Sequence, residues 1–414
     1  MAASTLRLMP LPLALAIVLA GCAGVQGPPQ TAVQPTLAIQ AALQQQNLQL
    51  DSERKPIDAR WWQAFGDPLL TPLIQQALQT HPDISSAQAG VQSARAQSVI
   101  ARAGLLPSLS AGASARGHQD GSSFSAGLDA SWEADVFGAN RLANASAAVD
   151  VQAAQAGLED VRALLAAETA RQYVNLRLGE ARLAMARQTL QSRQQALQLI
   201  QLREQAGLSS GLDTAQAQLS LNQVRAQIPS LDSVITQSYS ALATLTGLPV
   251  ASLKTRLARS QGIPRARLQL ANHIPAQALR QRPDIRAAEY RIRAAGLRVS
   301  EARANLNPAF RLGGALSLGS ARLTDLLDTG NLARSLLTSI SAPLFDGGRL
   351  QQQVVLRDAA LQQAQASYRK ALLQAVQDIA NRFAELEALQ RQRPLLLENL
   401  RLAQNNERLA LLNY

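Results

Sequence analysis

The feature that most constrains this 414-residue chain is an internal duplication. Two short motifs return 201 residues later, and two more return 208 residues later. We therefore predict one structural unit written twice, with a seven-residue insertion in the second copy, in the loop between its strands. The matched segments are 82–84 with 283–285, 106–107 with 307–308, 135–138 with the residues around Phe345, and 163–165 with 371–373.

Two stretches in each copy alternate between apolar and small or polar residues, which is the period of a β-strand. In the first copy they are 109–116 and 123–133, with a loop predicted at 117–122. In the second copy they are 310–318 and 336–342. A tilted strand needs roughly 9–11 residues to cross the outer membrane, which these stretches approach. Soluble sandwich strands alternate in the same way, so the pattern predicts two hairpins without deciding their surroundings.

Four strands per chain predict an oligomer if the strands enter a membrane. An open sheet edge cannot lie in lipid, because its backbone N–H and C=O groups would remain unsatisfied. Small closed barrels need about eight strands or more, so two copies of the chain would suffice. Three copies would supply twelve strands.

Long helices are predicted beside the hairpins. Residues 140–205 contain no proline, and a helix of that length spans roughly 100 Å at about 1.5 Å per residue. A break at 207–211 and a second helix over 212–246, with a kink at Pro229, predict a helical hairpin with a tight tip. Leucines at strict seven-residue spacing predict a coiled-coil seam in each copy: Leu176, Leu183, Leu190 and Leu197, then Leu395, Leu402 and Leu409.

The N-terminus has the pattern of an export signal. Arg7 precedes an apolar run over 8–20 that is too short to span a membrane. The segment Leu19-Ala20-Gly21-Cys22 resembles the lipobox of bacterial lipoproteins, in which the thiol is acylated and becomes the first residue after cleavage. Cys22 is the only cysteine, so no intrachain disulfide is possible. Ala23 is not an acidic retention signal, which favours sorting to the outer membrane and favours the membrane interpretation of the strands.

Charge and motif content disfavour two classes of protein. The formal net charge is +11, but the arginines are scattered along predicted helix faces, so we expect no nucleic-acid partner. The three histidines lie in unrelated contexts, and no phosphate loop or nucleophile elbow is present, so we expect no enzyme, cofactor or metal. Three carboxylates are expected on one strand face, where solvation of a barrel lumen explains them better than acid–base chemistry: Asp129, Glu133 and Asp135.

Taken together, the ordered motifs resemble the outer-membrane efflux protein family, the TolC-like export ducts, and within it the lipoprotein branch of NodT type. The resemblance covers nearly the whole chain. The segments that carry it are 61–68 (Trp-Trp-Gln-Ala-Phe-Gly-Asp-Pro), the two Pro-Asp-Ile units at 82–84 and 283–285, the tip 206–209 with Asp213, and 345–349.

The resemblance implies a mainly α-helical protein with a small β part. Three copies would form a twelve-stranded outer-membrane barrel set on a periplasmic α-helical tunnel, through which small molecules pass passively. A periplasmic adaptor would grip the helical tips and connect them to an inner-membrane transporter, which we expect to be proton-driven. By this analogy Gly207, Leu208 and Ser209 are candidate adaptor contacts, although Gly207 also serves simply to permit a tight turn.

The predicted organisation has five segments. They are a signal peptide at 1–21, a lipid-anchored segment at 22–60, a first efflux repeat at 61–250, a linker at 251–274 and a second repeat at 275–414. The second repeat departs from the family pattern because the counterpart of the return helix 212–246 is missing. We expect three of the four long helices, in either a fragment or a shortened and impaired product. The sequence is also compatible with a protein or peptide secretion conduit, and with a lipid-anchored structural coiled coil that forms no pore.

Overall fold

The computed structural model describes residues 50–51, 60–119, 121–259, 262–266, 274–326, 328, 330 and 332–412. Cys22 and the predicted signal peptide lie outside these residues. The described part is mainly helical with one four-stranded sheet, which confirms the predicted fold class. Its elements are β1 (Leu50–Asp51), η2 (Trp61–Phe65), α3 (Leu70–Thr80), α4 (Pro82–Ala103), β2 (Ser108–His118), β3 (Gly121–Ala134), α5 (Ala139–Gln205), α6 (Gly211–Thr246), α7 (Val250–Leu257), β4 (Ile274–Pro275), α8 (Ala276–Gln281), α9 (Pro283–Ala304), β5 (Ala309–Ser320), η3 (Leu323–Asp325), β6 (Leu332–Ser341) and α10 (Arg349–Leu412).

The order of elements repeats along the chain. A 22-residue helix, two strands and a long helix occur as α4, β2, β3 and α5, and again as α9, β5, β6 and α10. Pro82 and Pro283 are the first residues of the two 22-residue helices, where proline costs no hydrogen bond. The connection between the strands is longer in the second copy and contains η3, where the insertion was predicted.

The chain divides into two compact units that do not coincide with the two copies. Unit 1 contains the described residues of 93–153 and 288–414, and therefore all four long strands. Unit 2 contains those of 43–92 and 154–287. Each unit thus draws on both copies of the repeat.

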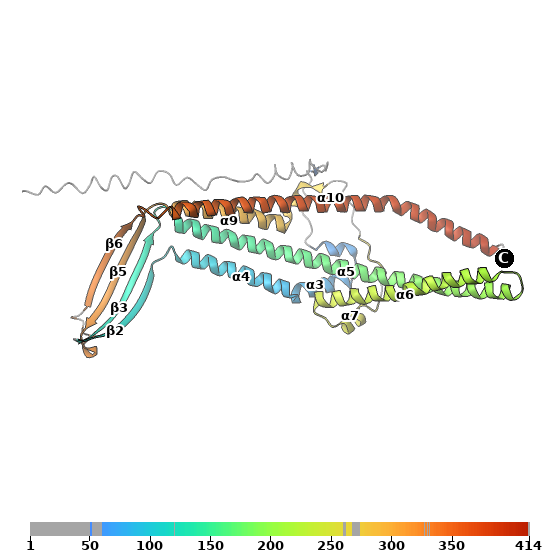
Figure 1. Ribbon diagram of the computed structural model, residues 1–414, viewed down its shortest axis with the longest axis horizontal. Coiled ribbons are helices and arrows are strands. Elements are labelled where there is room, and N and C mark those ends of the chain that lie inside the picture. The colour runs from blue at the N-terminus through green and yellow to red at the C-terminus, as the bar shows by residue number, and fades with distance from the viewer. Residues whose placement is uncertain are drawn as a thin grey trace, which may run out of the picture. The chain divides into compact units, whose positions relative to one another are not determined.

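Unit 1 holds a four-stranded antiparallel sheet in the order β2-β3-β5-β6, shown side by side in Figure 1. The strands are 10 to 14 residues long. The turn between β2 and β3 lies within the loop predicted at 117–122 but is shorter, because β2 continues to His118 and pairs there with Gly121 of β3.

Both long helices of unit 1 begin at a carboxylate. Asp135 accepts hydrogen bonds from the backbone N–H groups of Asn140 and Arg141, at 3.1 and 2.9 Å, where α5 starts. Asp346 does the same for Gly348 and Leu350, at 2.9 and 3.0 Å, where α10 starts. A carboxylate at this position pairs with orphan N–H groups and with the positive end of the helix dipole.

The larger apolar core of unit 2 joins five of its elements. Side chains from η2, α3 and α7 pack against the facing sides of α5 and α6. Helix α7 occupies part of the segment predicted as a linker, because Leu253 and Leu257 are buried in this core. The principal buried members are Trp62, Leu70, Ile74, Tyr173, Leu176, Leu242, Leu253 and Leu257.

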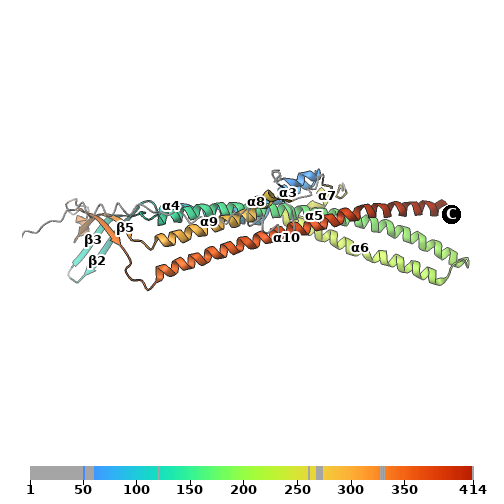
Figure 2. The ribbon, with the colours of Figure 1, turned by 90° about the horizontal axis from the view of Figure 1, so that it is seen from above.

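Unit 2 also contains most of the α5–α6 hairpin, and Figure 2 shows its two helices running side by side to a tight tip. The helices end and begin within one residue of the predicted boundaries. Pro229 lies inside α6 without ending it.

Candidate functional site: a two-faced sheet and a helical tip

The sheet of unit 1 has one apolar face. In the β2–β3 and β3–β5 pairs, apolar residues of this face are directly opposed, as in Ala111 opposite Leu128, and Leu128 opposite Leu316. In the β5–β6 pair Arg334 interrupts the face, opposite Leu316. Large apolar side chains on this face are exposed, which is unusual for a face that meets water. Those exposed are Leu109, Leu128, Trp132, Leu312, Leu316, Leu332, Leu336 and Ile340.

The opposite face is mostly small and polar, with Leu337 of β6 as a large apolar exception. Ser108 and Ser114 of β2 share hydrogen bonds of 2.8 Å with Ser131 and Ser125 of β3 through their hydroxyl groups. Glu133 forms an ion pair with Arg311 at 3.1 Å across the β3–β5 seam. An antiparallel sheet with such opposed faces suits a boundary between lipid and water.

Two of the three carboxylates predicted on one strand face are placed there. Asp129 and Glu133 lie in β3 and alternate with its apolar residues. The prediction that Asp135 lies in the strand is wrong, because β3 ends at Ala134. Asp135 instead caps α5 and forms an ion pair with Arg141 at 3.1 Å. Orphan N–H groups at the helix start compete for this side chain, which alternation alone does not reveal.

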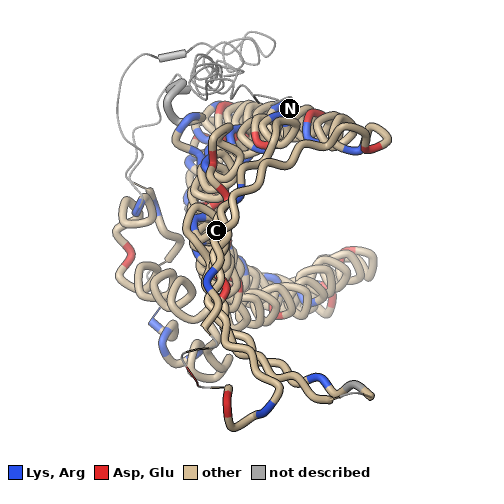
Figure 3. Tube along the Cα trace, turned by 90° about the vertical axis from the view of Figure 1, so that its left-hand side faces the viewer, with Lys and Arg blue, Asp and Glu red and all other residues tan. Residues whose placement is uncertain are grey.

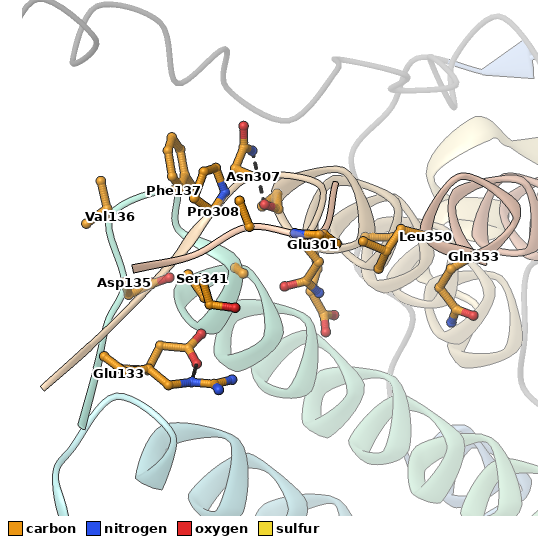
Figure 4. Close-up of a pocket in the computed structure, with 18 of the residues that line it drawn as sticks. Glu133, Asp135, Val136, Phe137, Glu301, Asn307, Pro308, Ser341, Leu350 and Gln353 are labelled. Carbon is orange, nitrogen blue, oxygen red and sulfur yellow. Dashed lines mark hydrogen bonds and ion pairs between the residues drawn. The ribbon is translucent and has the colours of Figure 1, made fainter. Parts of the chain in front are cut away.

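A cavity of about 710 Å³ lies in unit 1 where the strands meet the helices (Figure 4). Glu133 and Ser341 contribute from the strands, and Glu301 from α9. Burial raises the pKa of the Glu301 carboxyl, although Arg357 and Arg298 nearby favour its charged form. The lining carries both signs of charge, from Glu133, Asp135, Glu301, Arg298, Arg311, Arg349 and Arg357.

The predicted tip residues lie together at the α5–α6 turn. Gly207 adopts a φ of +73°, which favours glycine, and the Leu208 N–H donates to the Arg203 carbonyl at 2.8 Å. Leu208 is exposed. Ser209 donates its hydroxyl to Asp213 at 3.0 Å. An exposed leucine on a rigid turn is compatible with a contact surface.

The tip is rigid because Ser210 and Asp213 form a capping box at the start of α6. Hydrogen bonds from the backbone and hydroxyl of Ser210 and from Ser209 lower the pKa of the Asp213 carboxyl. The Thr214 hydroxyl also donates to Glu204 of α5. The sequence pattern Ser-x-x-Asp, from Ser210 to Asp213, could have predicted this cap.

A buried polar network in unit 2 was not found from the sequence. The guanidinium of Arg177 is fully buried, donates to Glu180 at 2.7 Å and to the Leu257 carbonyl at 3.1 Å, and lies 5.0 Å from the centroid of the Tyr173 ring. The Tyr173 hydroxyl donates to Asp67 at 2.8 Å. Burial raises the pKa of Tyr173 to about 12. Asp67 belongs to the segment 61–68, but its partner is 106 residues away and nothing in the sequence marks it.

The two histidines within the described residues belong to different units. His81 lies in the turn before α4, where its Nδ1 accepts from the Asp83 N–H at 3.2 Å. His118 ends β2, and His273 is outside the described residues. Within the described ranges, no three His, Cys, Asp or Glu side chains gather as a metal site.

None of the helices in the described part of the chain is both long and apolar enough to cross a membrane.

Basic and acidic residues are interspersed along the helical tubes in Figure 3.

Comparison with known proteins identifies the family. The profile of the family described as outer membrane efflux protein matches residues 73–248 and 274–411. The chain belongs to this family, as the resemblance implied. Members are efflux channel proteins of the outer membrane, so this chain is an outer-membrane channel component of an efflux system.

Individual relatives agree with this assignment. The chain is 32% identical to the pyoverdine export outer membrane protein OpmQ of Pseudomonas putida, over 81% of this chain and 74% of that protein. It is 30% identical to nodulation protein T of Rhizobium leguminosarum bv. trifolii, over 86% and 78% of the two chains.

Solved structures share the fold. The outer-membrane channel OprN superposes with a TM-score of 0.77 at 30% identity, covering 83% of this chain and 79% of that chain. The open state of the Neisseria gonorrhoeae MtrE outer membrane channel gives 0.75 at 27% identity, covering 88% and 85%.

Proposed function

We propose that this chain is one protomer of a homotrimeric duct whose twelve-stranded barrel carries small molecules passively from the periplasm to the exterior. The observation that carries this proposal is the four-stranded sheet with one apolar and one polar face. Lipid suits the first face and a water-filled lumen suits the second.

Closure of the barrel supports the trimer. The outer edges of β2 and β6 have no strand neighbour among the described residues. In lipid those edges must be satisfied, and three copies supply twelve strands, enough for a closed barrel with a lumen.

The energy for export comes from elsewhere in this proposal. An inner-membrane transporter, driven by protons, supplies it, and a periplasmic adaptor connects that transporter to the duct. The tip residues Gly207, Leu208 and Ser209 are the proposed adaptor contacts, of which Gly207 and Leu208 are exposed and Ser209 is half-buried. The helical hairpin supports this role because its rigid tip presents a leucine to solvent.

Acylation of Cys22 is the proposed second attachment to the outer membrane. Each buried CH₂ of an acyl chain contributes about 0.8 kcal/mol, so several chains together anchor a protein stably. A relative named as a probable outer membrane lipoprotein, SilC of Salmonella typhimurium, is 29% identical over 81% of this chain. Labelling cells with an alkyne fatty acid would mark the wild type, and a Cys22→Ser variant would remain unlabelled.

The small-molecule substrate class is supported by the names of relatives. One is a toluene efflux pump outer membrane protein, and another is a pyoverdine export protein. A conduit for secreted proteins or peptides shares this fold and remains the second candidate. Swelling of liposomes that hold solutes of graded size separates the two.

Conductance across a planar lipid bilayer tests the pore itself. We expect the purified full chain to give discrete conductance steps. A coiled coil that forms no pore would leave the bilayer closed under every voltage and pH, and that result would overturn the proposal. A tip variant, Leu208→Ala, is the matched control, because it should keep its conductance and lose only adaptor binding.

A further inference from the structure

The cavity of unit 1 carries charges that the repeated fold does not require. Its helical residues can be compared with the first copy of the repeat through the offsets of 201 and 208 residues. The residues of the second copy and their counterparts are Arg298 with Gln97, Glu301 with Ile100, and Arg357 with Val149. The first copy therefore builds the same junction of helix, strands and long helix with uncharged residues at all three positions.

The carboxylates around the cavity provide little free negative charge. Glu133 forms an ion pair with Arg311, and Asp135 forms one with Arg141, both at 3.1 Å. Burial raises the pKa of the Glu301 carboxyl, so the negative form of this group is disfavoured here. Two of the three carboxylates are thus paired, and the third is held in a setting that opposes its charge.

Two arginines of the lining have no carboxylate partner in the part of the chain that the structure describes. They are Arg349 and Arg357 of α10, and Arg357 is half-buried. Arg357 and Arg298 both lie close enough to Glu301 to favour its charged form, so these two guanidinium groups face the same part of the cavity. A half-buried cation without a partner has lost part of its hydration, which a bound anion would replace.

The cavity is continuous with the polar face of the sheet. Glu133, Arg311 and Ser341 line the cavity and also belong to that face. Figure 4 shows Glu133 and Ser341 from the strands and Glu301 from α9 around the same space. Its volume of about 710 Å³ is within the range of small-molecule sites, which is roughly 300–1,000 Å³. A solute that moves along the polar face therefore meets a recess large enough to hold it.

We propose that this cavity is a transient binding site for small organic carboxylates, with Arg357 as the main contact and with Arg298 and Arg349 beside it. A guanidinium group donates two parallel hydrogen bonds to a carboxylate, which suits it to this class of ligand. The passage of the ligand rests on the proposed function. The site adds a substrate class and the residues that bind it.

Ligand binding by the purified full chain tests the site. Line broadening in fluorine NMR detects weak binding of para-fluorobenzoate, and para-fluorobenzamide is the neutral match. We expect the carboxylate to bind at least about fivefold more tightly than the amide. Equal binding of the two probes would overturn the proposal, because the protein would then select for the ring and not for the charge.

Arginine variants locate the binding. Arg357→Gln should weaken carboxylate binding about fivefold, as expected for loss of a half-buried ion pair. Arg369→Gln is the matched control, because Arg369 also lies in α10 without an ion pair to a described residue, but is exposed and outside the cavity. Equal losses for the two variants would mean that only the net charge of the protein attracts the anion, and would overturn the assignment.

A variant with the opposite expected effect excludes a folding defect as the explanation. Glu301→Gln removes a carboxyl group that repels the ligand when it is charged, and should tighten carboxylate binding about twofold. A misfolded variant would lose binding instead. Unchanged or weaker binding by a Glu301→Gln variant with wild-type circular dichroism would overturn the placement of the ligand beside Glu301.

The outcomes separate the site from the duct. Conductance steps in a planar bilayer without carboxylate binding would overturn the site and leave the proposed function intact. Carboxylate binding by a chain that gives no conductance would overturn the proposed function and the passage of the ligand, and would support the binding site alone. When both are observed, para-fluorobenzoate should lower the current of the wild type more than that of Arg357→Gln. Equal lowering would overturn the position of the site on the conduction path.

Discussion

Two leucine stripes with the same seven-residue spacing, one in α5 and one in α10, differ in how far their side chains are buried. In α5, Leu176, Leu183 and Leu197 are buried. Leu176 is part of the apolar core to which η2, α3, α6 and α7 of unit 2 contribute. In α10 the leucines within 389–409 are exposed, including Leu395, Leu402 and Leu409. Leucine spacing decides which face of a helix is apolar, and burial depends on what packs against that face.

The largest expected effect comes from breaking the buried network beside the first stripe. Arg177→Ala removes a guanidinium that Glu180 and the Leu257 carbonyl require, and should lower the free energy of unfolding by about 3–5 kcal/mol. Chemical denaturation followed by circular dichroism measures it. Arg382→Ala is the control, because Arg382 also pairs with a glutamate three residues on, at 2.9 Å, but is exposed on α10. Equal losses for the two variants would contradict the network's role.

The second prediction compares the stripes directly. Leu176 is 0% exposed and Leu402 is 54% exposed. Leu176→Ala should therefore cost about 2–5 kcal/mol, and Leu402→Ala less than about 0.5 kcal/mol, in the monomer. If Leu402→Ala instead costs as much as Leu176→Ala once trimers have formed, the second stripe is buried in the assembly. Denaturant midpoints of monomer and trimer, measured side by side, decide this.

The third prediction concerns Tyr173. Tyr173→Phe leaves the Asp67 carboxylate without its 2.8 Å partner, which should cost about 1.5–3 kcal/mol. The pKa of Tyr173 rises from its ordinary 10.0 to about 12, so only the unfolded chain loses the proton between these values. The resulting stabilisation is present in full below pH 10 and is lost as the pH rises through 12. The free energy of unfolding of the wild type should therefore fall more steeply with pH over this range than that of Tyr173→Phe. Identical pH dependences for the two proteins would refute the raised pKa of Tyr173.

The smallest effect is expected at the tip. Ser210→Ala removes the capping box of α6 and should cost about 1 kcal/mol locally. Because the pKa of Asp213 is lowered, the cap is present above the ordinary aspartate pKa and is lost as the pH falls through the lowered value. Amide hydrogen exchange at 211–214 reports it, with Thr244→Ala as a control inside the same helix. No change in exchange would mean that the turn is held by its backbone alone.

Most of the fold could be predicted from local patterns. Helices α5 and α6 begin and end within one residue of the expected positions, because runs of strong helix formers end at glycine. The strands were found from their alternation, and the tip from its Gly-Leu-Ser-Ser-Gly sequence. Predictions were wrong where a side chain binds a partner that the local pattern does not show. Asp135 is the example, because it caps α5 instead of continuing β3.

Part of the candidate site was beyond prediction for the same reason. Arg177 looks like any other arginine on a helix, and only the carbonyl of Leu257, 80 residues away, explains its burial. The cavity lined by Glu301 likewise depends on α9, β3 and α10 coming together.

Local sequence patterns were enough to predict the duplicated order of elements, the four long strands and the apolar stripes of α5 and α10. These properties follow from residue periodicity, which is local and is set by backbone geometry. The tertiary structure alone decided which stripe is buried, which carboxylate caps a helix and which arginine enters the core. Those outcomes depend on contacts between residues far apart in the chain, and periodicity contains no information about the partner.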